Sequence, residues 1–464
     1  MNAIILISIL GVVTMLSDIL HFKKAIWYVI IVSLTGAILI NFSQWSKPEL
    51  YYEMLYMDNF AIIFSNLIIF LVLIWFFISK EEYESGEFNA GDNYALILFA
   101  TVGALLLTSY LDLSLLFLGI EILSIPLYIL AGSRKHDLSS NEASLKYFIM
   151  GAFATGILLF GITLIYGATG TFKLDLIAQY ANSNNGNLPL MFYSGVLLIM
   201  IGLGFKVSAV PFHFWTPDVY QGSPMFITAY MATIVKTAAF AGFYRLFSTS
   251  FSSISGTWSV TLMVIIGLTI LVGNLLAAYQ TSVKRMLAYS GISQAGYLLL
   301  TILVLNQDTK TALLLYLASY ALSTLAAFTV LYQVVKIKGD DSFDSFASLG
   351  KTNPFLAVIM AVSMLSLAGI PPTVGFFAKF YLFAAVLKAN PMNIWIIGLA
   401  VLGSLISVYY YFRVIISMYG SKTSDVISSP VKLNLTYQAI LVLVAGLIIL
   451  LGVAPGFILD INNL

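Results

Sequence analysis

The sequence contains no cysteine, which excludes disulfide bonds and iron–sulfur clusters held by cysteine thiolates. It has three histidines, His21, His136 and His213, and the first two fall in predicted loops, which argues against a haem held between two histidines inside a membrane. No glycine-rich nucleotide motif of the type GxGxxG or GxxxxGK[ST] is present. Charged residues make up only 9% of the chain and its net charge is +1, so no nucleic-acid partner is expected. We therefore expect no cofactor in this chain.

What the sequence has in excess is apolar residues. They form 60% of the 464 residues, and the mean hydropathy is +0.95. Almost every window of about 20 residues is apolar, which is the length that crosses a bilayer as a helix. We therefore predict an all-α polytopic membrane protein, a single bundle of about 14 transmembrane helices.

The predicted helices span roughly residues 2–20, 25–43, 58–79, 93–110, 112–131, 143–168, 190–210, 225–247, 258–280, 285–305, 310–336, 354–388, 392–418 and 434–454. The first 20 residues lack a basic start and a small-residue cleavage site, so we expect a retained first helix rather than a signal peptide.

The lysines and arginines of the predicted loops are unevenly distributed. Thirteen lie in loops that follow odd-numbered helices, and five lie in loops that follow even-numbered helices. Cytoplasmic loops carry the excess of basic residues. The odd-numbered loops are therefore expected in the cytoplasm, and both termini on the outer, periplasmic side.

Two of the predicted helices are interrupted. The seventh is expected to break at Pro211 and again at Pro217, and the twelfth is interrupted by the run 369–372, GIPP. If helices 4–8 and 9–13 form two units, each broken helix is the fourth of its five, and the odd number of helices inverts the second copy. Paired interruptions of this kind indicate a transport site.

The pattern therefore predicts two inverted five-helix repeats with discontinuous helices 7 and 12. They occupy residues 93–250 and 251–420, after an N-terminal three-helix segment at 1–92 and before a C-terminal helix 14 at 421–464.

Five charged residues lie inside the predicted helices, namely Glu121, Lys146, Lys206, Lys236 and Lys379. A charge at the centre of a bilayer costs roughly 2.5 kcal/mol or more, so such residues generally mark a path for ions or protons. Lysine and carboxylate groups change protonation readily when they are buried, which suits proton traffic.

Two readings of Glu121 compete. It is either a structural, hydrogen-bonded carboxyl or the counter-ion of Lys206, and its depth, about 20 Å of helix from Arg134, favours the second reading. Lys236 lies at the middle of its helix, too far from either end to reach the interface, which favours a functional role.

The sequence leaves the roles of several other polar residues open. Lys146 lies four residues after Glu142, so an ordinary ion pair on the helix surface explains it as well as a transport role does. His213, just beyond Pro211, could relay protons or bond backbone groups freed at the break. Asp112 and Asp218 lie near predicted helix ends, where capping or solvation suffices.

Three stretches of the sequence resemble a known family. They are LGFKVSAVPFHFWTPDVYQGSP at 203–224, SVKRMLAYSGISQAGY at 282–297 and LAGIPPTVGFFAK at 367–379. They are similar to the antiporter-like membrane subunits of respiratory complex I, and most similar to the subunit N type of bacterial NADH–quinone oxidoreductase. The resemblance covers essentially predicted helices 4–13.

The resemblance implies a proton-translocating module without a redox centre, driven by quinone reduction in neighbouring subunits. Carried onto this chain, Glu121 and Lys206 are the switchable pair, Lys236 is the central relay, and Lys379 is the terminal residue of the second half-channel. Opening and closing of the Glu121–Lys206 pair would push a proton onward. A sibling subunit has glutamate where this chain has Lys379, which favours the subunit N type.

The same resemblance implies partners and a location. Other membrane subunits of complex I, including sibling antiporter-like subunits, would surround the chain in the bilayer. Quinone, NADH, flavin and iron–sulfur clusters would belong to partner subunits. The animal mitochondrial counterpart lacks the first three helices, which are present here, so a bacterial inner membrane is expected.

Two other functions compete with this one. A subunit of a multisubunit cation/proton antiporter would share the scaffold. A membrane enzyme or quinone-binding subunit would belong to a different class, but the lack of cysteine, paired histidines and nucleotide motifs argues against it.

Overall fold

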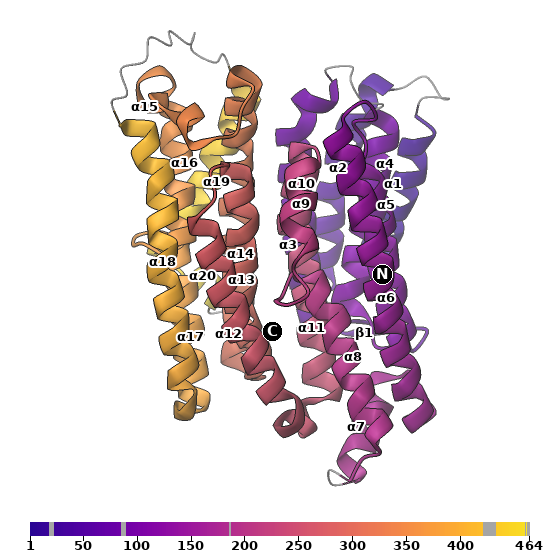
Figure 1. The fold of residues 1–464 in the computed structure, drawn as a ribbon. Coiled ribbons are helices and arrows are strands. Elements are labelled where there is room, and N and C mark those ends of the chain that lie inside the picture. Colours follow the sequence, from indigo (N-terminus) through magenta and orange to yellow (C-terminus); the bar gives the residue numbers. More distant parts are fainter. Residues whose placement is uncertain (18–22, 85–89, 185–186, 421–432, 460, 462–464) are drawn as a thin grey trace.

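Long helices run up and down through the molecule and leave the loops at its two ends (Figure 1). This computed structural model describes the chain except for residues 18–22, 85–89, 185–186, 421–432, 460 and 462–464. Within the described part, eleven helices are long and apolar enough to cross a membrane. Three shorter apolar helices, Asn2–Met15, Leu190–Lys206 and Pro354–Ala368, accompany them. The predicted all-α polytopic fold with about 14 spans is confirmed.

The N-terminal segment contains α1 (Asn2–Met15), α2 (Lys23–Ser43) and α3 (Asn59–Glu84). Helices α2 and α3 are joined by polar contacts: the Trp27 indole N–H donates to the Phe76 carbonyl at 3.1 Å, and the Asn41 amide donates to the Asn66 amide oxygen at 3.1 Å. Such bonds satisfy polar groups that the bilayer cannot.

The first predicted repeat contains α4 (Ala90–Ser109), α5 (Leu113–Ala131), α6 (Leu138–Thr169), the broken pair α8 (Leu190–Lys206) and α9 (Trp215–Gly222), and a last span of α10 (Met225–Tyr230), the π-helical turn η1 (Met231–Val235) and α11 (Lys236–Ser250). The second contains α12 (Ser255–Ala278), α13 (Val283–Leu303), α14 (Gln307–Lys338), the broken pair α16 (Pro354–Ala368) and α17 (Val374–Ala389), and α18 (Ile394–Tyr419).

The two units pack in the same order. Helix α4 packs on α5 as α12 packs on α13, and the long α6 packs on α8 and α9 as the equally long α14 packs on α16 and α17. In Figure 1 the second unit stands beside the first, with α12–α19 on the left and α1–α11 on the right. The matching positions of the two broken helices thus correspond to a repeat in packing order.

Short elements and a final span complete the chain. They are α7 (Leu174–Ser183), η2 (Ser252–Ile254), η3 (Phe343–Phe346), α15 (Leu349–Thr352), η4 (Pro391–Asn393), α19 (Leu435–Val453) and α20 (Gly456–Leu459). Helix α19 is predicted helix 14. The proposed boundary at residue 420 adjoins 421–432, which lie outside the described residues together with Lys422 and Lys432.

Three features differ from the sequence-based expectation. Pro217 does not break the chain a second time, because it is the third residue of α9, where a helix needs no N–H donor. Helix α7 replaces a predicted loop and buries Leu174, Ile177 and Ala181, a spacing that follows one helical face. A hairpin of β1 (Glu49–Tyr51) and β2 (Leu55–Met57) lies in the predicted loop after α2.

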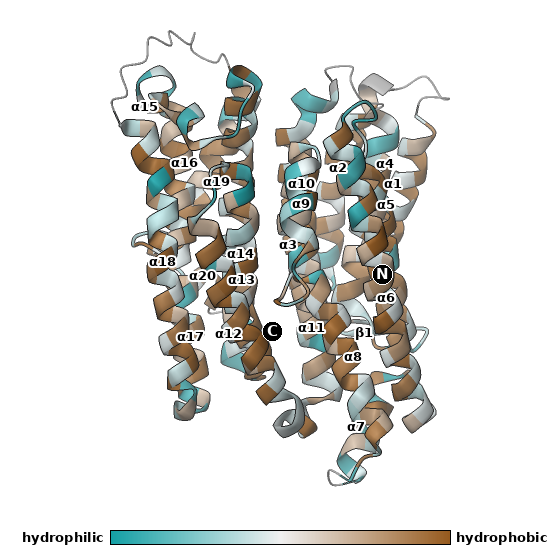
Figure 2. Ribbon diagram, viewed as in Figure 1, coloured by the Kyte–Doolittle hydropathy of each residue, from teal (hydrophilic) through white to brown (hydrophobic). Residues whose placement is uncertain are grey.

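Apolar residues cover most of the length of the helices, and hydrophilic residues gather near the loops at both ends (Figure 2). The loops after even-numbered spans meet at one end, where Leu55 pairs with Tyr110 and Asp112 with Lys173. The loops after the ninth and eleventh spans meet in a bridge between Ser282 and Ser342. The alternation of ends required by the predicted topology is therefore present.

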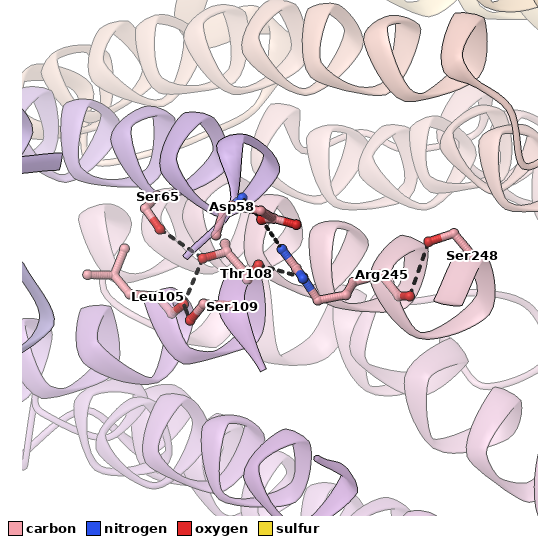
Figure 3. A network of polar contacts seen from close by, with 8 residues as sticks. Asp58, Ser65, Leu105, Thr108, Ser109, Arg245 and Ser248 are labelled. Atoms are coloured by element: carbon pink, nitrogen blue, oxygen red, sulfur yellow. Dashed lines mark hydrogen bonds and ion pairs between the residues drawn. The ribbon is translucent and has the colours of Figure 1, made fainter. Parts of the chain in front are cut away.

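An ion pair between a buried arginine and a partly exposed aspartate joins the N-terminal segment to the first repeat (Figure 3). Arg245 of α11 is 5% exposed; its guanidinium donates to Asp58 at 2.5 Å and to the Thr108 carbonyl of α4 at 2.8 Å. The Thr108 hydroxyl in turn bonds Ser65 of α3 at 2.8 Å. The guanidinium of α11 is thus bonded to α4 and to the start of α3, and these two helices also bond each other through Thr108 and Ser65.

Replacing Arg245 should destabilise the bundle. An Arg245→Met variant removes the buried guanidinium that bonds both Asp58 and the Thr108 carbonyl, which we expect to cost about 3 kcal/mol. The measurement is the fraction of the detergent-solubilised chain that remains monodisperse on size-exclusion chromatography after heating.

The matched control is Lys388→Ala. Lys388 pairs with Asp308 at 2.7 Å, but its side chain is 77% exposed, so its loss should change little. Equal heat stability of both variants would contradict the role given to Arg245.

Candidate functional site

Lys206 is enclosed at the end of α8. It is 5% exposed, and its ammonium donates to the Ser124 hydroxyl of α5 at 2.5 Å. The same nitrogen lies 5.9 Å from the ring centre of Tyr128 and 5.8 Å from that of Tyr147. Aromatic ring faces attract cations. Lys206 is therefore held by a hydroxyl and two rings contributed by α5 and α6.

Glu121 lies on α5, one turn before Ser124, and is half-buried. In the part of the chain that the structure describes, no ion pair joins it to Lys206; Ser124 occupies that position instead. At about 100° per residue, Glu121 lies between the inward face of Ser124 and an outward face that exposes Leu118 (48%) and Ile125 (51%). The predicted pairing is thus not direct in this conformation.

Backbone N–H and carbonyl groups at the first break have hydrogen-bond partners within the segment 204–215 and, in one case, on α12. The Ala209 N–H donates to the Gly204 carbonyl at 2.8 Å, and the Val210 N–H donates to the Thr269 hydroxyl of α12 at 3.0 Å. The Trp215 indole donates to the Phe205 carbonyl at 3.1 Å. The break is therefore stabilised by specific hydrogen bonds, one of which comes from the second repeat.

His213 lies inside this break and is 5% exposed. Its carbonyl accepts from the Thr216 N–H at 2.9 Å, and its ring contacts that of Phe214, with 4.5 Å between their centres. Over the described residues its Nδ1 atom has no hydrogen-bond partner. Among the described residues, none of these contacts of His213 is with a lysine. His213 therefore lies beside the three buried lysines and does not bond any of them.

Lys236 follows directly on the π-helical turn η1 and is 1% exposed. Such turns widen a helix and are frequent at functional sites. The ammonium donates to the Gly291 carbonyl of α13 and lies 5.7 Å from the ring centre of Tyr320. A Cβ atom at position 291 would lie 3.1 Å from the Lys236 nitrogen, so glycine makes this approach possible.

Lys379 of α17 is held by the second break. Its ammonium donates to the carbonyls of Leu367 at 3.2 Å and Ala368 at 2.9 Å, and to the Ser404 hydroxyl at 2.9 Å. In a regular helix these carbonyls would accept from residues 371 and 372, but both are proline and have no N–H. The two prolines therefore leave free the acceptors that Lys379 uses.

A polar cluster lies between Lys236 and Lys379. Gln294 of α13 accepts from the Tyr316 hydroxyl at 2.6 Å and donates to the Tyr411 hydroxyl at 3.2 Å. Tyr411 bonds Ser290 at 2.7 Å, next to the Gly291 carbonyl that holds Lys236. Gln294 and Tyr316 also line a small cavity with Lys379. The cluster thus extends from the Lys236 contact to Lys379.

Lys146 forms ion pairs on the helix surface, which is one of the two explanations that the sequence left open for it. It pairs with Glu142 at 2.7 Å and with Asp218 of α9 at 2.8 Å, and its side chain is 40% exposed. Asp218 also pairs with Arg285 of α13 at 3.1 Å. Lys284 donates to two carbonyls of the α9 end. A helix-surface pair therefore explains Lys146.

These charged groups line a cavity of about 410 Å³ at the end formed by the odd-numbered loops. A neighbouring cavity of about 420 Å³ shares Arg134, Gln221, Lys284 and Asp341 with it. Over the described residues, no group of three or more His, Cys, Asp or Glu side chains could hold a metal ion.

Sequence reasoning missed several of these residues. Gln294, Tyr316 and Tyr411 are uncharged, and a search restricted to charges does not find them. For Gln294 a signal existed, because a buried amide also needs partners in a membrane. Capping or solvation does not explain Asp218, because it links α6, α9 and α13 by ion pairs. Asp112 does cap α5, accepting from Ser114 N–H at 2.8 Å.

Comparison with known proteins agrees with this architecture. The family of NADH:quinone oxidoreductase/Mrp antiporter transmembrane proteins matches residues 111–407. NADH-quinone oxidoreductase subunit N of Cytophaga hutchinsonii is 51% identical over 463 residues, which cover 100% of this chain and 99% of that protein.

Solved structures share the fold. A chain of respiratory complex I from Thermus thermophilus with bound aureothin superposes with a TM-score of 0.83 at 31% identity, covering 99% of this chain and 98% of that chain. A chain of the Mrp complex from Dietzia sp. superposes with a TM-score of 0.87 at 20% identity, covering 99% and 95%, which shows a common fold. The full-length identity to the Cytophaga protein and the family match decide the assignment, and the chain belongs to the subunit N family of the NADH-quinone oxidoreductases.

Proposed function

We propose that the chain translocates protons through Lys206, Lys236 and Lys379 and holds no redox centre of its own. The observation that supports this most is the chemistry around the three ammonium groups. Each donates to a hydroxyl or a main-chain carbonyl, and over the described residues none forms an ion pair with a carboxylate. A lysine bound to a carboxylate is fixed in its charged form, whereas one bound to neutral acceptors can be charged or neutral.

Proton uptake is assigned to the cavity that contains Lys146 and Asp218, on the side predicted to be cytoplasmic. Tyr147 follows Lys146 in α6, and its ring faces Lys206. The Asp218 carboxylate, which pairs with Lys146 and Arg285, lines this cavity and can take up a proton from water. A proton taken up there would pass Tyr147 on its way to Lys206.

Onward transfer is assigned to the cluster between Lys236 and Lys379. Hydroxyl groups both donate and accept hydrogen bonds, so Ser290, Tyr411 and Tyr316 can pass protons together with water. The cavity beside Lys379 has a volume of about 10 Å³, which is close to the volume needed to hold one water molecule.

Glu121 is assigned to the coupling between this chain and a neighbouring membrane subunit. A carboxylate facing lipid is costly, and the surrounding outward face of α5 exposes Leu118, Ile125 and Ile129. A second membrane protein covering this face would bury the apolar residues and offer Glu121 a polar partner. A change in the charge of Glu121 could then affect Lys206 through Ser124, which lies one helical turn away and bonds the lysine.

The complex that contains this chain would supply the energy by reducing quinone. NADH, flavin, iron–sulfur clusters and quinone are assigned to partner subunits, and sibling antiporter-like subunits to its membrane neighbours. We place the chain in a bacterial inner membrane with both termini on the periplasmic side, as the distribution of lysine and arginine favours.

A subunit of a cation/proton antiporter is the alternative function. The fold shared with the Dietzia Mrp complex chain suits it. The full-length identity of 51% to a subunit N favours the oxidoreductase. Copurification of the tagged chain in mild detergent separates the two, because flavin and iron–sulfur proteins accompany it only in the oxidoreductase.

Removing either member of the Glu121–Lys206 pair should reduce pumping. In Lys206→Ala or Glu121→Ala, we expect NADH-driven acidification of inverted membrane vesicles to slow by about tenfold or more, because a group that carries or controls the proton is lost. Native gels should show the complex still assembled.

The control for this pair is Lys173→Ala, which removes an exposed lysine that pairs with Glu53 outside the spans. Its acidification rate should equal that of the wild type. Wild-type acidification in both Lys206→Ala and Glu121→Ala would refute their assigned roles.

A methyl group at position 291 should also disturb transport. In Gly291→Ala the new Cβ would press on the Lys236 nitrogen and on the Tyr320 hydroxyl, 3.1 and 3.0 Å away. We expect the same acidification rate to fall by about 3- to 10-fold, since small displacements at a transfer site are costly. Gly156→Ala on α6, where the added atom meets nothing within 4 Å, is the matched control. Equal rates in the two variants would count against the Lys236–Gly291 contact.

A further inference from the structure

The carbonyl oxygen of Leu367 accepts two side-chain donors at the second break. The Gln294 amide donates to it at 3.1 Å, and the Lys379 ammonium donates at 3.2 Å. Its helical donor is missing because residue 371 is proline. Two buried side chains from different helices, α13 and α17, therefore share one acceptor.

The contacts of Lys379 match its charged form. An ammonium has three N–H donors, and three acceptors surround it: the Leu367 and Ala368 carbonyls and the Ser404 hydroxyl. A neutral amine has only two N–H donors. When the proton leaves, one of these contacts either loses its N–H donor or, at Ser404, reverses so that the hydroxyl donates to the amine. Of the two carbonyl contacts, the one to Leu367, at 3.2 Å, is the longer and has a second donor in Gln294.

The Gln294 amide is fixed in the orientation that can replace this donor. It is 2% exposed; its oxygen accepts from the Tyr316 hydroxyl at 2.6 Å, and its nitrogen donates to Tyr411 and Leu367. Rotating the amide by half a turn would set its oxygen against the Leu367 carbonyl, which is repulsive. An amide neither gains nor loses a proton near neutral pH, so this donor is present whatever the state of Lys379.

We propose that Gln294 is a positioning residue for proton release by Lys379, a role that rests on the proposed function. Its amide keeps the Leu367 carbonyl bonded while Lys379 gives up its proton and loosens its hold on the break. A buried carbonyl without a donor is unfavourable. Without Gln294, this free-energy cost would raise the barrier to proton release from Lys379. Gln294 thereby lowers the barrier to discharge of Lys379 and carries no proton itself.

The geometry of the adjoining cavity agrees with this role. Gln294, Tyr316 and Lys379 line it together with Tyr320 and Ser366. A proton released by Lys379 toward this cavity would leave beside the Gln294 contacts. The amide is therefore placed where the change in hydrogen bonding occurs.

The test is Gln294→Met in the intact complex reconstituted into liposomes. We expect NADH-driven proton translocation to slow by about fivefold or more, the factor that follows from leaving one buried carbonyl without a donor. The ratio of turnover in H₂O to that in D₂O should rise above the wild-type value, because proton release from Lys379 becomes the slow step.

Two further variants keep the test decisive. Gln294→Asn keeps an amide but shortens the side chain by one methylene, so it cannot bond both the Tyr316 hydroxyl and the Leu367 carbonyl as Gln294 does. It should change both readouts in the same direction by a smaller factor, and it decides if Gln294→Met does not assemble. Gln333→Met removes another amide that is 1% exposed but lies outside this cluster, and it should leave the isotope ratio unchanged.

Wild-type translocation in the assembled variant, or a slower rate with a wild-type isotope ratio, would overturn the proposal. The latter result would mean that Gln294 only supports packing. Lys379→Met separates this failure from that of the proposed function. Wild-type translocation in Lys379→Met overturns both, whereas loss in Lys379→Met with none in Gln294→Met overturns the role of Gln294 alone.

Discussion

Every charged or polar group inside this bundle needs a partner, because neither the bilayer nor an apolar core provides one. The three central lysines meet this constraint with neutral oxygen atoms: the Ser124 hydroxyl for Lys206, the Gly291 carbonyl for Lys236, and two carbonyls with the Ser404 hydroxyl for Lys379. Inside a continuous helix every carbonyl already accepts from the N–H four residues later, and free carbonyls occur only at the end of a helix. The interruption at residues 369–372 therefore creates acceptors that an intact span would lack.

The two repeats solve the same problem differently. In the first, Lys206 precedes the break and takes its acceptor from α5, while Thr269 of the second unit supports the broken backbone. In the second, Lys379 follows the break and uses the carbonyls that the prolines free. Lys236 joins the units, because its acceptor, Gly291, belongs to α13. The polar contacts thus cross from one repeat to the other.

Hydropathy and proline positions were sufficient to predict the spans, both broken helices and the placement of Lys206 and Lys379 beside them, because each depends on local chain chemistry. Which side chain of α5 contacts Lys206 could not be predicted, since helix rotation, which decides whether Glu121 or Ser124 faces Lys206, depends on packing. The π-helical turn before Lys236 and the Gln294 cluster depend on contacts among distant helices. The break assigned to Pro217 was wrong because proline is tolerated in the first turn of α9.

The measurement that tests the central claim most directly is the number of protons translocated per NADH oxidised by the complex with Lys236→Met, reconstituted into liposomes at equal amounts of assembled complex. Among the contacts of the described residues, the acceptor of Lys236 lies in the other repeat, whereas those of Lys206 and Lys379 lie in their own. If protons pass by way of the three lysines, the ratio or the coupled turnover must fall well below the wild-type value. A wild-type ratio at wild-type turnover would contradict a proton path through the buried lysines.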